Sequence, residues 1–148
     1  MISDTHGLLR PEALAALAGS DLIVHAGDLG GPEVLQRLAQ LAPVRAVRGN
    51  VDRGAWAAAL PLTDMIDVEG AALYVLHVLE ELDLDAAAAG IALVICGHTH
   101  RPRLERRGSV LFLNPGSAGP RRFDLPVSVA RLVVDGKRVT PELVELPA

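Results

Sequence analysis

The segment from Leu93 to His100 places the strongest constraint on how this chain can fold. The three apolar residues Leu93–Ile95 are typical of the end of a buried strand, and Gly97 follows almost at once. A sharp turn after this glycine lets the imidazoles of His98 and His100 point into one cavity. Neutral imidazole is the commonest metal ligand in proteins, so this strand end is a candidate metal site.

Four further predicted strand ends carry side chains of the same kind. Each side chain offers an oxygen or nitrogen donor, and the residues are Asp4 and His6, Asp28, Asn50, and His77. With the two histidines above, the set has seven donors, whereas a single zinc ion needs about four. The number favours two metal ions with one bridging carboxylate. Two cations roughly 3.5–4 Å apart can hold a hydroxide between them and neutralise a phosphoryl group under attack.

Taken singly, these residues also have simpler explanations. Asp4 could cap a turn with His6 on the surface of a frayed terminus, and Gly49-Asn50 is a common turn dipeptide. His25 lies inside a predicted strand, where a packing or supporting role is favoured over metal binding. It is the occurrence of all seven donors at strand ends that favours a common site.

Helical and strand patterns alternate in the first half of the chain. Prolines at Pro11 and Pro32 predict helices over 11–18 and 32–41. Strands are predicted over 21–28 and 44–48, and a short helix or loop over 53–61. The acidic turn at Asp28 stands where a strand gives way to a loop, which is where open α/β sheets bind ligands.

Hairpins dominate the second half. Segments 63–68 and 71–76 flank a Glu-Gly turn, and segments 127–134 and 139–146 flank Asp135-Gly136. A further strand is predicted over 110–113, and an Ala-rich helix is predicted to end at Ala89 with Gly90 as its cap. This order predicts an α/β protein with a mixed sheet, or two stacked sheets, and helices outside.

Composition narrows the functional classes. The 148 residues predict one domain, 1–148, and the net charge of −4 argues against general binding of nucleic acid. A single cysteine, Cys96, excludes an internal disulfide and fits a reducing compartment. No apolar run reaches the ~18 residues of a membrane span. A cytoplasmic protein is predicted, and the apolar late hairpins leave a homo-oligomer open.

The ordered motifs resemble the signature of the calcineurin-like metallophosphoesterases. The matching residues are Asp4-x-His6, Gly27-Asp28, Gly49-Asn50, His77, Gly97-His98-x-His100 and Asn114-Pro115-Gly116-Ser117. In length and in its hairpin ending the chain is similar to the small, single-domain bacterial and archaeal phosphodiesterases of that superfamily. The resemblance implies a sandwich of two stacked mixed β-sheets flanked by helices, with the ligands at strand ends.

The resemblance also implies how the chemistry is divided. The first metal would be held by Asp4, His6, Asp28 and His100, and the second by Asn50, His77, His98 and the bridging Asp28. A bridging hydroxide would attack the phosphorus of a small phosphate ester, with diesters favoured over monoesters and Asp28, Asn50 and His98 as catalytic residues. Manganese is the first expectation, and iron, zinc, nickel or magnesium are also compatible with imidazole and carboxylate ligands.

Two departures from the family pattern affect the expected activity. Many relatives have a histidine directly after Gly-Asn, and several have His-Gly-His at the later motif, where this chain has Val51 and Leu79. Leaving-group protonation would then rest on water, Asp52 or an arginine. General acid catalysis is worth roughly 10²–10⁴-fold, so a slow enzyme that prefers good leaving groups is predicted.

Only Met1-Ile2-Ser3 precede Asp4, whereas relatives carry a longer apolar strand there. A truncated first strand or a misassigned start is predicted, together with weak binding of the first metal. Four arginines, Arg101, Arg103, Arg121 and Arg122, flank the His98 and Asn114 turns, and at most one is expected to meet a phosphate.

These departures also favour an alternative, a catalytically weak or inactive scaffold. The retromer subunit that resembles these enzymes uses the fold in that way. The complete donor set favours the enzyme. A nuclease is disfavoured by the acidic balance and the scarcity of aromatic residues.

Overall fold

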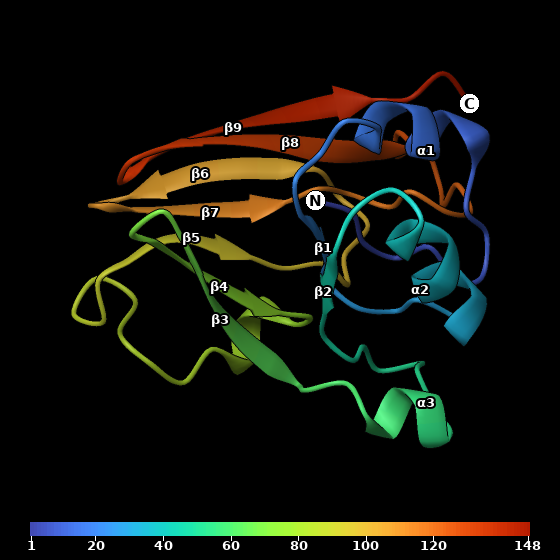
Figure 1. Cartoon of the computed structure of the whole chain (residues 1–148), viewed down its shortest axis with the longest axis horizontal. Coiled ribbons are helices and arrows are strands. Elements are labelled where there is room, and N and C mark those ends of the chain that lie inside the picture. The colour runs from blue at the N-terminus through green and yellow to red at the C-terminus, as the bar shows by residue number, and fades with distance from the viewer.

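The computed structural model describes residues 1–148 and contains short helices and strands, which form one mixed sheet and two smaller strand pairs (Figure 1). The helices are α1 (Pro11–Leu17), α2 (Pro32–Ala39), α3 (Ala55–Ala58) and the 3₁₀ helix η1 (Leu79–Glu81). The strands are β1 (Ile23–His25), β2 (Val44–Ala46), β3 (Thr63–Val68), β4 (Ala71–Leu76), β5 (Ile91–Ile95), β6 (Arg103–Arg107), β7 (Val110–Asn114), β8 (Ser128–Asp135) and β9 (Arg138–Glu145). No helix is long and apolar enough to cross a membrane.

A five-stranded mixed sheet has the order β3-β4-β5-β7-β6. Its three central strands are parallel, and the edge strands β3 and β6 pair antiparallel with their neighbours. Because β4, β5 and β7 run in one direction, the loops that follow them all leave from the C-terminal ends of these strands (Figure 1). His77, His98 and Asn114 lie at these strand ends.

The first residues of the chain join the remaining strands. Ile2 pairs in parallel with His25 of β1, and Met1 exchanges two backbone hydrogen bonds of 2.8 and 3.0 Å with Ala130 of β8. The parallel pair β1-β2 and the hairpin β8-β9 therefore lie on either side of residues 1–2. Burial of the Met1 amino group lowers its pKa to about 5. Asp4 thus follows directly on a segment that is paired on both sides.

Alternation along the strands divides the apolar residues between two faces of the five-stranded sheet. Leu93 and Ile95 of β5 pack with Val24 and Val47 from the β1-β2 side, which makes the core between the two groups of strands. Val94 instead faces the outer cluster that also contains Tyr74 and Val110. A further cluster packs α1 and α2 against β1 and β8. The predicted α/β class with mixed sheets is confirmed.

The prediction of an Ala-rich helix that ends at Ala89 is wrong. The chain makes a single turn there, in which Asp85 accepts the N–H of Ala88 through its side chain and that of Ala89 through its carbonyl. Of the four alanines only Ala86 is buried, so the segment has no apolar stripe to pack, and isolated short helices are marginal in water. The outer face of the five-stranded sheet is therefore covered by η1 and irregular chain.

Strand β6 was not expected, because its sequence Arg-Leu-Glu-Arg-Arg suggests a solvated surface segment. It forms by pairing with β7 over Arg103–Arg107, and four of its five residues are exposed. Charged side chains on an edge strand hinder pairing with other chains. The arginine pattern thus fits an edge position that depends on β7 for its hydrogen bonds.

Candidate metal centre

All seven predicted donors lie in loops that follow strand segments. Asp4 and His6 follow the paired residues 1–2, and the other donors follow the strands β1, β2, β4 and β5 as Asp28, Asn50, His77, and His98 with His100. Two backbone bonds hold the first loop against the second, because the N–H groups of Asp4 and His6 donate to the carbonyls of Gly27 and Asp28, each at 3.0 Å. Whether the first metal nevertheless binds weakly stays a prediction.

The seven side chains form two neighbouring groups. Asp4, His6 and His100 make one group, and Asp28, His77 and His98 make the other; within each group the potential ligand atoms lie within 4.8 Å of one another. Asn50 joins the second group, since its Oδ1 is 3.1 Å from Nδ1 of His98. The structure therefore brings together the seven residues that the sequence predicted as donors.

The two carboxylates lie between these groups. Asp28 Oδ2 is 3.1 Å from Nε2 of His77 and 3.8 Å from Nε2 of His6. Asp4 Oδ1 is 3.4 Å from Nε2 of His100 and 4.0 Å from Nε2 of His77. Asp28 is thus near members of both groups, which is the position that a bridging carboxylate requires.

Several buried polar atoms of the centre have no hydrogen-bond partner. They are Asp4 Oδ1, His77 Nε2 and His100 Nδ1. A buried polar group without a partner is costly, so such groups call for a ligand. In addition, Nε2 of His6 and Nε2 of His100 face each other at 3.2 Å. Asp4 Oδ1 thus lies among the Nε2 atoms of His100 and His77, and such converging oxygen and nitrogen donors fit divalent cations.

The backbone is strained at these positions. Positive φ angles are uncommon for residues other than glycine, and the chain has seven. Five of them belong to predicted ligands: Asp4 (54°), His6 (46°), Asp28 (58°), His98 (75°) and His100 (63°). Such conformations cost on the order of 1–3 kcal/mol each and concentrate at functional sites. Here the strained turns direct five donors into one cavity.

Hydrogen bonds fix the charge and direction of the central side chains. Burial tends to raise the pKa of Asp28, but the His77 imidazole and the Val51 N–H outweigh it and bring the pKa below its ordinary value. Burial likewise opposes protonation of His77, whose pKa is nevertheless raised by Asp28 and Asp4. His77 Nδ1 lies 2.7 Å from the carbonyl of Ala26 and donates to it. Its Nε2 is thereby left facing the centre.

Asp4 is supported from the loop that carries His98. Its Oδ2 accepts hydrogen bonds from the Ser3 hydroxyl at 2.7 Å and from the His98 N–H at 3.1 Å. Burial is the main cause that raises its pKa. Oδ2 is therefore engaged with the protein, and Oδ1 is the oxygen available to a cation.

His25 packs beneath the centre, as predicted, and is fully buried. Its Nδ1 accepts the N–H of Gly27 at 3.1 Å, so Nε2 carries the proton and donates to Oγ1 of Thr5 at 3.0 Å. Thr5 in turn donates to the carbonyl of Leu29. Burial lowers the pKa of His25 to about 3, so the ring is neutral and connects the loops of Asp4 and Asp28.

We expect this histidine to make the metal-free protein sensitive to acid. An unfolded histidine takes up a proton near pH 6.5, whereas His25 in the folded protein does so only near its pKa of about 3. Its contribution is complete above pH 6.5 and decreases as the pH falls toward 3, by about 2 kcal/mol between pH 7 and pH 5. Urea unfolding in chelator at both pH values should show a smaller pH dependence for His25→Asn. An equal pH dependence of the unfolding free energy in both proteins would contradict the attribution of the acid sensitivity to His25.

Asp52 has a structural role, which disfavours it as the group that protonates the leaving group. Its carboxylate accepts three backbone N–H groups, from Leu29 at 3.2 Å, Gly30 at 3.0 Å and Gly49 at 2.9 Å. The side chain thereby joins the loops that carry Asp28 and Asn50 and is buried beneath them.

The Asn-Pro-Gly-Ser motif after β7 supports two of the ligand-bearing loops. Asn114 donates to the carbonyl of Gly97 at 2.9 Å and to Oγ1 of Thr99 at 3.1 Å. Ser117 donates to the carbonyl of Asp4 at 3.0 Å. The motif thus supports the centre through side-chain hydrogen bonds, and none of its side chains joins the donor groups.

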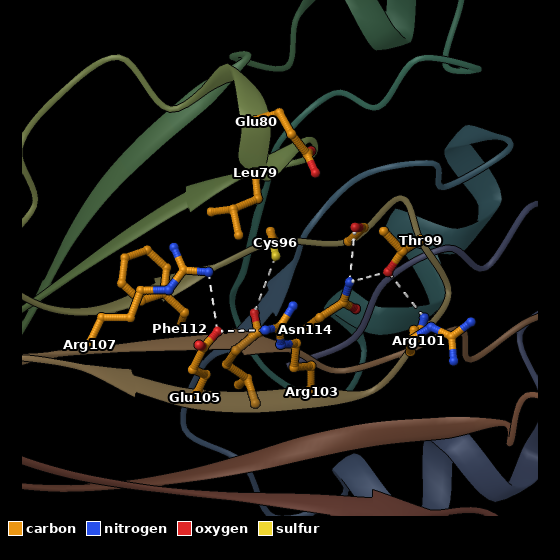
Figure 2. A pocket seen from close by; sticks show the side chains of 12 residues that line it. Leu79, Glu80, Cys96, Thr99, Arg101, Arg103, Glu105, Arg107, Phe112 and Asn114 are labelled. Atoms are coloured by element: carbon orange, nitrogen blue, oxygen red, sulfur yellow. Dashed lines mark hydrogen bonds and ion pairs between the residues drawn. The ribbon is translucent and has the colours of Figure 1, made fainter.

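A small cavity of about 80 Å³ lies on the other side of the His98 turn (Figure 2). Figure 2 shows Cys96 and Asn114 in its interior and Leu79, Arg101 and Arg103 around it. None of the seven donors lines this cavity. Leu79, at the place of the second imidazole of the His-Gly-His motif, packs into the outer apolar cluster and so faces this cavity.

The four arginines near these turns have different roles. Arg103 pairs with Glu105 at 2.9 Å, and Arg121 donates to the carbonyl of Ala148 at 2.9 Å. Arg101 lines the cavity behind the turn. Burial and then the charge of Arg122 lower the pKa of His100 to about 4. Of the four, Arg122 is the one whose charge acts on a predicted ligand.

Comparisons with known proteins agree with this geometry. A family model described as Calcineurin-like phosphoesterase superfamily domain matches residues 1–137. A probable metallophosphoesterase from Methanothermobacter thermautotrophicus is 34% identical over 161 aligned residues, which cover 100% of this chain and 92% of that protein.

Two solved structures overlay nearly the whole chain. A phosphoesterase from E. coli has a TM-score of 0.67 and 26% identity, covering 99% of this chain and 97% of its own. Vps29 from Chaetomium thermophilum has a TM-score of 0.79 and 20% identity, again covering 99% and 97% of the two chains. The similarity to Vps29 concerns the fold alone.

Proposed function

The chain belongs to the calcineurin-like phosphoesterase superfamily, and from this membership we infer that it is a metal-dependent phosphoesterase acting on small phosphodiesters. The observation that carries this proposal is the convergence of seven donors around buried atoms that lack protein partners. A protein that works without bound ions has no need to bury an unpaired carboxylate oxygen, Asp4 Oδ1, beside the imidazoles of His77 and His100.

The residues divide between two divalent cations. Asp4, His6 and His100 would hold the first and Asn50, His77 and His98 the second, with Asp28 shared between them. When bound, such ions lower the pKa of a water molecule and neutralise charge on a phosphoryl group. Manganese is our first choice, and the donor set also accepts iron, zinc, nickel or magnesium.

The protein groups have separate tasks in this proposal. Asp28 stays ionised, and His77 is oriented by the carbonyl of Ala26. Asn50 and His98 are the exposed members of the donor set, so they are the ones that a substrate would meet. One arginine near the centre, Arg122, supports a singly charged diester over a doubly charged monoester.

Neither Asp52 nor His25 nor the residue after Asn50 is well suited to protonate the leaving group. Asp52 is held by three backbone donors, and His25 is buried under the loops. The position after Asn50 is occupied by Val51, which cannot transfer a proton. We therefore expect turnover to be best for esters whose alcohol leaves without protonation, such as nitrophenyl diesters.

The alternative is a binding scaffold with little or no catalysis. The absence of an imidazole at positions 51 and 79 favours it. The complete donor set favours the enzyme, because a scaffold has no chemical use for seven converging donors.

The test is the metal dependence of diester hydrolysis. Protein stripped with chelator should be inactive on bis(4-nitrophenyl) phosphate and should regain turnover when manganese is added. Calorimetric titration of the same samples should show two ions bound per chain. If the ions bind but none of manganese, iron, zinc, nickel or magnesium restores turnover, the enzyme proposal is wrong and the scaffold is favoured.

A further inference from the structure

Three exposed apolar side chains belong to segments at the metal centre. The chain exposes eight large hydrophobic residues, among them Leu8, Val51 and Phe123. Leu8 lies two residues after His6, and Val51 follows Asn50 while its N–H donates to Asp28 at 3.0 Å. Single exposed apolar residues are ordinary, but apolar residues on loops that also carry the donors are candidates for contact with an organic ligand.

Phe123 is the most exposed of the eight, with 90% of its surface accessible. Its φ of 54° is in the left-handed region, which a bulky side chain rarely adopts. The next residues do not cover it, although the Leu125 N–H donates to the carbonyl of Arg122 and closes a turn around it. The chain thus holds an aromatic ring in solvent at the cost of a strained backbone, which points to a function outside folding.

The loop that carries Phe123 is fixed to the loop that carries Asp4 and His6. Ser117 donates to the carbonyls of Asp4 and Pro120, and Arg10 donates to the carbonyl of Gly119 at 3.0 Å. Gly119 lies so close to the carbonyl of Thr5 that a side chain would overlap it. Residues 121–123 therefore begin two residues after a point that is fixed against the loop of Asp4 and His6.

Two neighbouring arginines differ in their engagement. Arg121 is bound to the carbonyl of Ala148, whereas the Arg122 guanidinium has no hydrogen-bond or carboxylate partner, and its charge helps to lower the pKa of His100. A free guanidinium next to an exposed aromatic ring is suited to a ligand that combines an anionic phosphate with a planar group.

We propose that Arg122 and Phe123 form the substrate-recognition edge of the centre and select phosphoesters that carry a planar aromatic group. Arg122 binds a phosphate oxygen, and Phe123 stacks on the aromatic group, with Leu8 and Val51 as the remaining apolar surface. This inference rests on the proposed phosphoesterase function and adds the class of substrate to it.

The test is a comparison of two phosphonates that are not hydrolysed. Calorimetry on the manganese-loaded protein should show phenylphosphonate binding about tenfold more tightly than methylphosphonate, as expected for one stacking contact. Phe123→Ala should bring the two affinities together, and Arg122→Gln should weaken both by a similar factor. Val133→Ala removes another exposed apolar side chain, on β8, and should change neither. The phosphonate analogue of AMP tells whether a nucleobase replaces the phenyl ring.

Equal affinities for the two phosphonates, or an unchanged ratio in Phe123→Ala, would overturn the inference. Hydrolysis of methyl 4-nitrophenyl phosphate separates this failure from failure of the proposed function. Turnover of that ester without any phenyl preference refutes the recognition edge alone. A phenyl preference without turnover of any ester supports the edge and refutes the enzyme.

Discussion

Replacing Asp28 with asparagine should lower kcat/KM for bis(4-nitrophenyl) phosphate by roughly a thousandfold, equivalent to about 4 kcal/mol of transition-state stabilisation. Asp28 is the residue whose carboxylate oxygen lies near both groups of donors, at 3.1 Å from His77 and 3.8 Å from His6. Asparagine keeps the shape and can still accept the Val51 N–H through Oδ1. It removes the negative charge that two cations would share and that raises the pKa of His77.

Asp67→Asn is the matched control, since it makes the same chemical change on the surface. Asp67 is exposed, and its Oδ1 accepts the Gly70 N–H in the turn between β3 and β4, which asparagine can also do. This variant should keep full activity and bind two manganese ions. Asp28→Asn should bind manganese more weakly in calorimetry while its thermal unfolding in chelator remains cooperative. Retention of more than a tenth of the activity by Asp28→Asn would exclude a bridging role.

Local sequence signals were sufficient for most of the fold. Proline at N1 located α1 and α2, and Asp135-Gly136 located the hairpin of β8 and β9. The signals failed where an element depends on a distant partner. Strand β6 has a charged sequence and exists because β7 offers it a ladder of hydrogen bonds. The placement of Met1 between β1 and β8 likewise depends on Ala130, far away in the chain.

The donors could be predicted because their residue types and their positions at strand ends are both local features. Their supporting contacts could not. Asp52 accepts N–H groups from Leu29 and Gly30, more than twenty residues earlier, and an Asp after Gly-Asn gives no sign of this. The positive φ angles at Asp and His positions could not be predicted either, because these residue types, unlike glycine, do not indicate such a conformation. The proposed recognition edge depends on the solvent exposure of the Phe123 side chain, and no signal in the sequence indicates that this aromatic residue is exposed.

Gly49→Ala should disrupt the centre, lowering activity by at least about a hundredfold and the free energy of unfolding by roughly 1–3 kcal/mol. Gly49 does not have a positive φ, so alanine is acceptable to its backbone. The obstacle is space. A methyl group there would overlap the backbone nitrogen and Oδ1 of Asp28 and would lie 2.8 Å from its Cγ.

Asp28 cannot move away without loss, because its carbonyl accepts the His6 N–H and its Oδ1 accepts the Val51 N–H. Gly49 is held in turn by the bond from its N–H to Asp52. Gly31→Ala is the matched control: φ there is 176°, and the added methyl would meet only the flexible carboxylate end of Glu33. Calorimetry should show manganese affinity reduced in Gly49→Ala and unchanged in Gly31→Ala. If Gly49→Ala binds manganese normally, the close approach of its loop to Asp28 is not what positions the shared carboxylate, and rigidity of the Asp28 turn itself must do so.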